Sequence, residues 1–166
     1  RCPVMLSSSI QASLVGRYKD SEYGKSKKAG EDLFFTYGKE IGTRVLVYRF
    51  PNLFGKWCRP NYNSAVATFC NNIANDLPIQ VNDPNVELQL AYIDDVVDEL
   101  INALIEKENK VDEYCYIKTT YNVRLGSIVE KLYSFADYSN TLIMTDLEEN
   151  SFDKKLYSTF LSYLPE

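Results

Sequence analysis

The chain has 166 residues, with 45% hydrophobic and 25% charged side chains, which is typical of a domain that buries one sizeable core and excludes a disordered chain. Its net charge of −5 disfavours binding to a phosphate backbone, so we expect no nucleic-acid partner. No apolar run reaches the roughly 18 residues that span a bilayer, and the start lacks signal-peptide features, which predicts a cytoplasmic protein without a membrane partner.

Hydrophobic periodicity predicts alternating strands and helices, typical of an α/β fold with a parallel sheet. Gly42 is placed to end the first helix, and Asn63 or Ser64 to cap the second. Residues 51–63 and 139–150 are expected to be loops. In chain order we expect strands at 3–9, 43–50, 79–81, 87–92 and 113–118, and helices at 21–41, 64–73, 94–105, 125–135 and 152–161.

Tyr23 and Lys27 lie four residues apart in a helix-forming stretch, so their side chains share one helix face. A neighbouring ammonium favours the phenolate form of a tyrosine, which makes proton transfer efficient near neutral pH. Ser9 ends the preceding apolar strand and could bind the substrate oxygen that gains or loses the proton. These three residues are candidates for a proton-transfer site, with the adjacent Ser8 as the alternative serine.

The tyrosine–lysine spacing alone is weak, because it recurs at Tyr114 and Lys118. That second pair lies in an alternating, strand-like stretch that would place the two residues about 13 Å apart. The order of segments is more specific than the spacing. A strand, a serine triplet, the tyrosine–lysine helix and a second apolar strand are followed by Arg49-Phe-Pro-Asn-Leu-Phe-Gly55.

This order resembles the extended short-chain dehydrogenase/reductase family, the NAD-dependent epimerases and dehydratases of nucleotide sugars. The resemblance implies an oxidoreductase with NADP(H) or NAD(H) as cofactor and a UDP-sugar as substrate. It also implies that Ser9, Tyr23 and Lys27 are the catalytic set, and that Tyr23 and Lys27 contact the cofactor.

By the same resemblance, the backbone at Phe50 and Pro51 passes the nicotinamide, and Asn52 meets the sugar nucleotide, although Asn52 could be only a turn former. Many family members carry a diphosphate-binding arginine near the position of Leu88, which this chain lacks. Arg59 is our candidate replacement. Gln11, just after the serines, is a candidate substrate contact, with an exposed loop as the alternative.

Four further segments narrow the resemblance to the bifunctional capsule-sugar enzymes that lead to UDP-N-acetyl-L-fucosamine. That resemblance implies a reductase that delivers hydride to C4 of a 4-keto-6-deoxy UDP-sugar, with the tyrosine protonating the new alkoxide. The cupin domain that follows the reductase in those enzymes, and its metal, are not in this sequence. The segments are Ser7–Ala12, Pro51–Cys58, Pro60–Ser64 and Leu156–Pro165.

A dinucleotide-binding fold needs a glycine-rich turn after its first strand, and none of the seven glycines forms such a motif. We therefore expect a fragment that lacks the N-terminal half of the cofactor-binding domain and is inactive alone. The expected fold is the C-terminal part of a Rossmann-like sheet plus a small substrate-binding subdomain. Residues 1–60 would carry the catalytic set, and residues 61–166 mainly the substrate side, with a return to the core sheet.

Several alternatives stay open. A UDP-sugar 4-epimerase or a dehydratase shares the three catalytic residues, although dehydratases usually carry an acidic residue where this chain has Ile10 and Gln11. A non-enzymatic binding or assembly module with the same fold is the alternative of another class. We expect a homodimer, because an isolated fragment exposes a sheet edge that pairs with other chains.

Other polar and aromatic residues have plainer interpretations. Asp94 and Asp95 resemble a pair of acid–base carboxylates, but they fit better as helix caps. Trp57 could line a sugar pocket or cover the core. With no histidine and with four cysteines that lack metal-ligand spacing, the sequence predicts no metal site and excludes a Ser-His-Asp triad within this chain.

Overall fold

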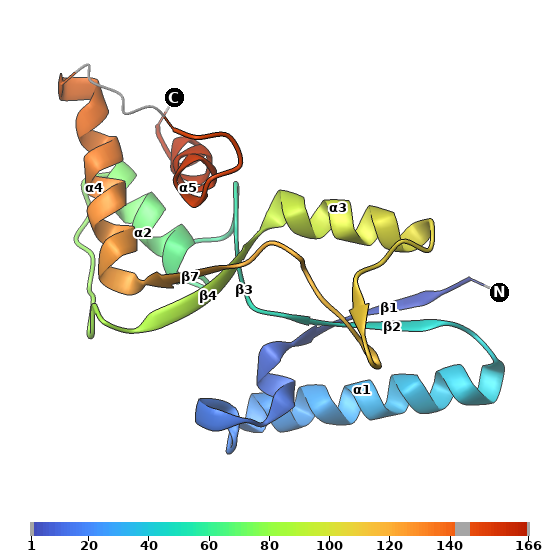
Figure 1. Ribbon diagram of the computed structural model, residues 1–166. Coiled ribbons are helices and arrows are strands. Elements are labelled where there is room, and N and C mark those ends of the chain that lie inside the picture. Colours follow the sequence, from blue (N-terminus) through green and yellow to red (C-terminus); the bar gives the residue numbers. More distant parts are fainter. Residues whose placement is uncertain (1, 142–146, 166) are drawn as a thin grey trace. The chain divides into compact units, whose positions relative to one another are not determined.

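The computed structural model describes residues 2–141 and 147–165, which form two compact units (Figure 1). Both units combine strands with helices, so the predicted α/β class is confirmed. The chain passes between the units more than once, and neither unit is a single continuous segment. Unit 1 comprises Arg1–Pro51 and Asp95–Lys118, and unit 2 comprises Asn52–Asp94 and Thr119–Glu166.

Unit 1 is built on a four-stranded sheet in the order β1-β2-β6-β5. β1 and β2 are parallel and in full register, so Ser9 and Phe50, their last residues, lie directly opposite each other. β2 pairs in parallel with β6, and β5 joins β6 in antiparallel orientation. The strands are β1 (Val4–Ser9), β2 (Val45–Phe50), β5 (Lys110–Val111) and β6 (Tyr114–Cys115).

Two helices cover opposite faces of the β1–β2 part of this sheet (Figure 1). They are α1 (Glu22–Ile41) and α3 (Ile93–Leu104), which enters unit 1 at Asp95. The central strand β2 is therefore buried on both faces, and its side chains alternate between them. Tyr48 faces α3, where its hydroxyl donates to Glu99 at 3.0 Å.

Local chemistry sets both ends of α1. The Ser21 hydroxyl oxygen accepts the backbone N–H of Gly24 at 3.0 Å and caps the start. Gly42 ends the helix in the left-handed region, with φ at 67°, and its N–H donates to the Gly38 carbonyl at 3.0 Å. The prediction that Gly42 terminates this helix is confirmed.

Unit 2 contains a three-stranded sheet in the order β3-β4-β7, with β4 parallel to β3 and antiparallel to β7. Three helices gather beside this sheet (Figure 1). The elements are β3 (Asn52–Phe54), α2 (Ala65–Ala74), β4 (Glu87–Tyr92), β7 (Tyr121–Arg124), α4 (Leu125–Thr141) and α5 (Phe152–Leu161).

One apolar core joins the elements of unit 2. It contains side chains from all three helices and from β3 and β4, and aromatic rings contribute much of its volume. Its buried members are Phe54, Val66, Phe69, Cys70, Ile73, Leu90, Tyr92, Ile128, Leu132, Phe135, Leu156 and Phe160.

Some predicted elements need correction. The strand predicted at 79–81 is wrong, because that segment pairs with no strand and the Gln80 and Asn82 side chains bond each other at 3.0 Å instead. The loop predicted at 51–63 contains β3, and β7 was not predicted, since strands this short show no clear alternation. The strand predicted at 113–118 is confined to β6, whose neighbour Tyr116 turns back to bond Asn109.

Helix boundaries also differ in two places. α3 begins at Ile93, immediately after β4, so Asp94 and Asp95 lie within its first turn and neither precedes it as a cap. Asp94 instead lies 3.6 Å from the Lys56 ammonium. α4 continues to Thr141, into the loop predicted at 139–150, and residues 142–146 of that loop lie outside the described residues.

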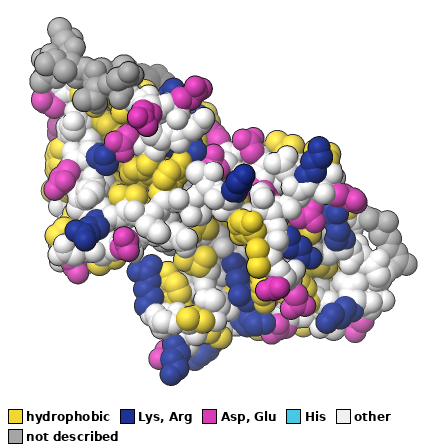
Figure 2. Space-filling view, in the orientation of Figure 1, with side chains coloured by type: hydrophobic (Ala, Val, Ile, Leu, Met, Phe, Trp, Pro, Cys, Tyr) yellow, Lys and Arg dark blue, Asp and Glu magenta, His cyan; other side chains and the backbone are white. Residues whose placement is uncertain are grey.

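Side chains of both charge signs are mixed with apolar ones on the face drawn in Figure 2. Acidic neighbours oppose the attraction of a polyanion to the basic side chains on that face. Within the part of the chain that the structure describes, no helix is both long and apolar enough to cross a membrane.

Candidate functional site

Ser9, the last residue of β1, is one member of the predicted proton-transfer set, a name used below for Ser9, Tyr23 and Lys27. Its hydroxyl oxygen accepts the backbone N–H of Gln11 at 3.2 Å and caps the short helix η1 (Ile10–Ser13). Because the oxygen is the acceptor in this bond, the hydroxyl proton can still be donated to another group. Ser8 differs: it is 5% exposed and donates its proton to Glu31 at 2.6 Å. This difference favours Ser9 over Ser8 as the candidate serine.

Tyr23 and Lys27 lie in the first two turns of α1, on the same helix face. The Lys27 ammonium is 5.6 Å from the centroid of the Tyr23 ring, within range of a cation–π contact. It also donates to the backbone carbonyl of Ser7, on β1, at 3.4 Å. Tyr23 is 52% exposed, so its phenol can be reached from solvent. The structure therefore brings this tyrosine and lysine together and ties the lysine to the serine-bearing strand.

Gln11 connects the turn after Ser9 to the start of the tyrosine helix. Its side-chain oxygen accepts the Ser21 hydroxyl proton at 2.8 Å, and Ser21 in turn caps α1. A Cβ on Gly24 would lie 2.4 Å from the Gln11 carbonyl oxygen, so the close approach of α1 to η1 requires glycine at this position. Gln11 is half-buried, and its role as a substrate contact stays a prediction.

Phe50 and Pro51, the predicted cofactor contacts, lie at the carboxyl end of β2. Phe50 is 9% exposed, its ring stacks on Tyr48 with centroids 5.5 Å apart, and it lies opposite Ser9 in the sheet. In open parallel sheets, ligands bind outside the carboxyl ends of the strands. The position of these residues therefore fits a nicotinamide dinucleotide, and their contact with it stays a prediction.

The remaining predicted residues belong to unit 2. Asn52 is exposed and its side-chain amide donates to the Gln89 carbonyl at 3.4 Å. Arg59 is exposed, with its guanidinium carbon 5.5 Å from the centroid of the Tyr62 ring. Trp57 is 82% exposed, so the interpretation that it covers the core is wrong.

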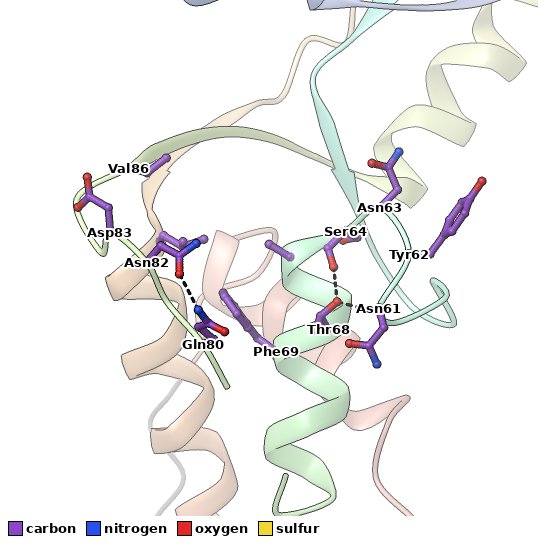
Figure 3. A pocket seen from close by; sticks show the side chains of 12 residues that line it. Asn61, Tyr62, Asn63, Ser64, Thr68, Phe69, Gln80, Asn82, Asp83 and Val86 are labelled. Atoms are coloured by element: carbon purple, nitrogen blue, oxygen red, sulfur yellow. Dashed lines mark hydrogen bonds between the residues drawn. The ribbon is translucent and has the colours of Figure 1, made fainter. Parts of the chain in front are cut away.

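Unit 2 also contains a cavity of about 660 Å³, here called the amide pocket (Figure 3). Its wall combines the loop before α2 and the start of α2 with the segment that precedes β4. The Thr68 hydroxyl fixes that loop by accepting the N–H of Asn61 at 2.9 Å. No lysine or arginine is among the lining residues, which are Asn61, Tyr62, Asn63, Ser64, Ala65, Thr68, Phe69, Gln80, Asn82, Asp83, Val86 and Leu125.

Sequence reasoning did not find the amide pocket or the buried carboxylate of Glu31. The amides of the pocket come from segments on either side of α2, so no local spacing unites them. Two of them, Gln80 and Asn82, fell in or beside a segment wrongly predicted as a strand. Glu31 did carry a usable signal, because it lies four residues beyond Lys27 on the same helix face.

Comparison with known protein families assigns the chain to one of them. The pattern of the NAD dependent epimerase/dehydratase family matches residues 7–123. The chain belongs to this family. The resemblance to extended short-chain dehydrogenases/reductases is thereby confirmed, and the matched region contains the whole proton-transfer set.

Two relatives match nearly the whole chain. The UDP-2-acetamido-2,6-beta-L-arabino-hexul-4-ose reductase of Pseudomonas aeruginosa is 44% identical over 99% of this chain and 42% of its own length. The capsular polysaccharide assembling protein CapF from Staphylococcus aureus is 47% identical in its crystal structure, with a TM-score of 0.90, over 98% of this chain and 44% of that chain. The chain thus spans less than half the length of either relative.

A more distant structure supports the fold alone. UDP-glucuronic acid 4-epimerase from Bacillus cereus, solved in complex with NAD, aligns with a TM-score of 0.77 at 18% identity, over 97% of this chain and 61% of that chain. The Rossmann-like character predicted for the parallel sheet is therefore confirmed.

Proposed function

We propose that the chain is the catalytic and substrate-side part of a reductase that uses NADPH or NADH to reduce the C4 ketone of a 4-keto-6-deoxy UDP-sugar. The observation that carries this proposal is the Tyr23–Lys27 pair on α1, tied to the Ser9 turn of β1 by the Lys27–Ser7 and Gln11–Ser21 hydrogen bonds. The proposed role is in making capsular or O-antigen polysaccharide precursors. The names of the two relatives support a nucleotide-sugar substrate and the capsular polysaccharide role.

In the proposed reaction, a reduced nicotinamide would, when bound, supply the hydride that adds to C4. Tyr23 donates its phenolic proton to the ketone oxygen as that oxygen gains negative charge. Lys27 stabilises the resulting phenolate, and Ser9 orients the same oxygen through its free hydroxyl proton. Phe50 and Pro51 would lie beside the nicotinamide, and residues outside this chain would bind most of the dinucleotide.

The amide pocket supports a role for unit 2 in binding the polar, uncharged parts of the substrate. Amide side chains can donate and accept hydrogen bonds, and Phe69 offers an aromatic surface. The pocket lining contains Asp83 and no basic residue, so it would not attract a diphosphate. Arg59, beside the pocket residue Tyr62, would supply that positive charge, and Asn52 would contact the sugar nucleotide.

Replacing Tyr23 by Phe in the full-length protein that contains this chain tests the proposal. Loss of the general acid should lower kcat by about 10²- to 10⁴-fold while the affinity for the reduced cofactor changes little. Tyr37→Phe is the matched control, because Tyr37 lies on the same helix at 47% exposure and should keep full turnover. Turnover of the Tyr23→Phe variant at the wild-type rate would contradict the assignment.

Epimerase and dehydratase activities share the same three residues, and product analysis separates them from a reductase. A reductase consumes one reduced cofactor for each sugar, whereas an epimerase regenerates its cofactor in every cycle. The proposal also includes a cytoplasmic homodimer, and a monomer in light scattering of the full-length protein would contradict the dimer.

A further inference from the structure

Glu31 is a fully buried carboxylate in the middle of α1, the helix that carries Tyr23 and Lys27. It is 0% exposed, and both of its oxygens accept hydrogen bonds. Oε1 accepts from the Ser8 hydroxyl at 2.6 Å and from Arg49 Nε at 3.0 Å, and Oε2 accepts from Arg49 Nη2 at 2.6 Å. One side chain of α1 is thus bonded to both parallel strands, β1 through Ser8 and β2 through Arg49.

Tyr114 of β6 covers the Arg49 side of this network. The Arg49 guanidinium carbon lies 3.6 Å from the centroid of the Tyr114 ring, and Phe35 meets the same ring edge-on at 5.7 Å. The Tyr114 ring covers one side of the guanidinium, whose side chain is 20% exposed, and the hydrogen bonds that Arg49 donates to Glu31 raise the pKa of Arg49. A buried ion pair of this kind adds little net stability, because apolar side chains of similar size often stabilise a protein equally well. The paired hydrogen bonds from Arg49 to Glu31 fix the orientation of α1 on β2 more narrowly than apolar packing does.

The position of Glu31 connects this fixed geometry to the proton-transfer set. Tyr23, Lys27 and Glu31 succeed one another at intervals of four residues along one face of α1. On β1, the Ser8 that bonds Glu31 immediately precedes Ser9. Rotation or sliding of α1 on the sheet would therefore break the Glu31 bonds and change the positions of Tyr23 and Lys27 relative to Ser9 together.

We propose that Glu31, with Arg49, is a positioning residue for the reaction. It sets the rotation of α1 about its own axis and the position of α1 along β1 and β2. This inference rests on the proposed function, because it concerns the geometry of the same proton-transfer set. Because Glu31 is 0% exposed, it would act through the position of α1 and not by touching the substrate or the cofactor. Misplacement of reacting groups by about 1 Å can cost on the order of 10²-fold in rate, so an anchor of this kind is enough to control turnover.

Glu99 of α3 provides a matched control within unit 1. It is also buried, at 3% exposure, and it bonds the Tyr48 hydroxyl at 3.0 Å and the backbone N–H of Asn109 at 2.8 Å. Its helix, however, carries none of the proton-transfer set. Glu31→Gln and Glu99→Gln should both destabilise the protein, but only Glu31→Gln should disturb the chemistry.

The two variants are compared in the full-length protein by steady-state kinetics with protiated and 4-deuterated reduced cofactor. For Glu31→Gln we expect kcat to fall about 10- to 100-fold with a little-changed KM, and the deuterium isotope effect on kcat to increase because hydride transfer becomes rate-limiting. The isotope effect is a ratio, so a loss of folded protein alone leaves it unchanged. Glu99→Gln should keep the wild-type isotope effect.

Hydrogen exchange gives a second readout that is independent of turnover. Glu31→Gln should speed exchange in the first turns of α1, around Tyr23 and Lys27, whereas Glu99→Gln should do so in α3. If Glu31→Gln fails to fold, Arg49→Lys replaces it, because lysine keeps the charge and loses the bidentate fork. Tyr114→Phe keeps the ring over the guanidinium and should behave as wild type.

Equal isotope effects and equal losses of rate in the Glu31→Gln and Glu99→Gln variants would overturn the inference and leave Glu31 with a role in stability only. If Tyr23→Phe keeps full turnover in the same assay, the proposed function fails and this inference fails with it. If Tyr23→Phe is inactive and Glu31→Gln keeps the wild-type isotope effect, only the inference fails.

Discussion

The two units of this chain bury different kinds of side chain. In unit 2, the core of α2, α4 and α5 against β3 and β4 is a continuous apolar cluster rich in aromatic rings. Unit 1 also buries apolar side chains, but each face of its β1–β2 sheet in addition contacts one buried carboxylate, Glu31 of α1 on one face and Glu99 of α3 on the other. Packing of apolar side chains tolerates small shifts, whereas paired carboxylates fix a helix in one orientation.

This difference follows the proposed division of labour. Unit 1 carries the proton-transfer set, which must be held in a narrow geometry. Unit 2 carries the amide pocket, where polar side chains on loops can adapt to a neutral ligand. Among the described residues both buried carboxylates lie in unit 1, whereas the buried charged residue of unit 2 is Lys155. Three predictions test this contrast in order of decreasing effect.

The largest expected effect is the loss of a core ring in unit 2. Phe160 on α5 is 1% exposed and packs near Phe135, with centroids 6.5 Å apart. Phe160→Ala should lower the free energy of unfolding by about 3 to 5 kcal/mol, because the cavity cannot close fully. Denaturant unfolding measures this change, and Leu161→Ala, one residue further at 45% exposure, should stay within about 0.5 kcal/mol of wild type.

Hydrogen exchange on the same two variants tests whether the cores are separate. In Phe160→Ala, amides of α4 and α5 should lose protection, and those of Val45–Phe50 in β2 should keep theirs. Equal loss of protection in β2 would show that the two units unfold together and would remove the basis of the comparison.

A smaller effect is expected where α1 meets η1. Gly24→Ala would place a Cβ 2.4 Å from the Gln11 carbonyl oxygen, so the helix must shift, at a cost of about 1 to 3 kcal/mol. Gly30→Ala, on the same helix with open space around it, should instead stabilise by about 0.5 to 1 kcal/mol through helix propensity. Thermal unfolding of both variants checks the signs.

If unit 1 is as rigid as its buried carboxylates imply, Gly24→Ala should also lower kcat in the full-length protein, since the shift moves Tyr23. Gly30→Ala should leave kcat unchanged. A Gly24→Ala variant that matches wild type in both stability and kcat would show that the tyrosine helix can slide without consequence.

The sequence predicted well those elements whose ends have local chemical causes. Gly42 closes α1, Ser64 caps α2, and the helix expected at 152–161 matches α5 at both ends. β3 and β7 were missed because three or four residues are too few to show a period, and their pairing with β4 is a tertiary effect. Local sequence carries no information about such pairing.

The candidate site likewise contains features that the sequence predicted and features that only the structure showed. The Tyr23–Lys27 contact follows from helical spacing alone, and the structure contains it. The preference for Ser9 over Ser8 needed the structure, because it depends on Glu31, which is far from both serines in sequence. The amide pocket could not be predicted from the sequence either, since it joins segments on either side of α2.

The smallest expected effect concerns a hydrogen bond between uncharged groups that joins the segment after α5 to the loop after β3. The Tyr163 hydroxyl donates to the Cys58 carbonyl, and burial raises the pKa of Tyr163 to about 12 from its usual 10.0. The unfolded chain therefore releases this proton near pH 10, whereas the folded chain keeps it until about pH 12. The stabilisation is complete below pH 10 and is lost as the pH rises through 12.

Tyr163→Phe should cost about 1 kcal/mol of unfolding free energy at neutral pH through the lost hydrogen bond. Between pH 10 and 12 the wild type loses stability by releasing this proton more readily when unfolded, and the variant does not, so the advantage of the wild type should shrink as the pH rises. Denaturant unfolding at several pH values measures this difference, with the exposed Tyr133→Phe variant on α4 as the control. A difference that stays constant up to pH 12 would mean that Tyr163 titrates alike in both states.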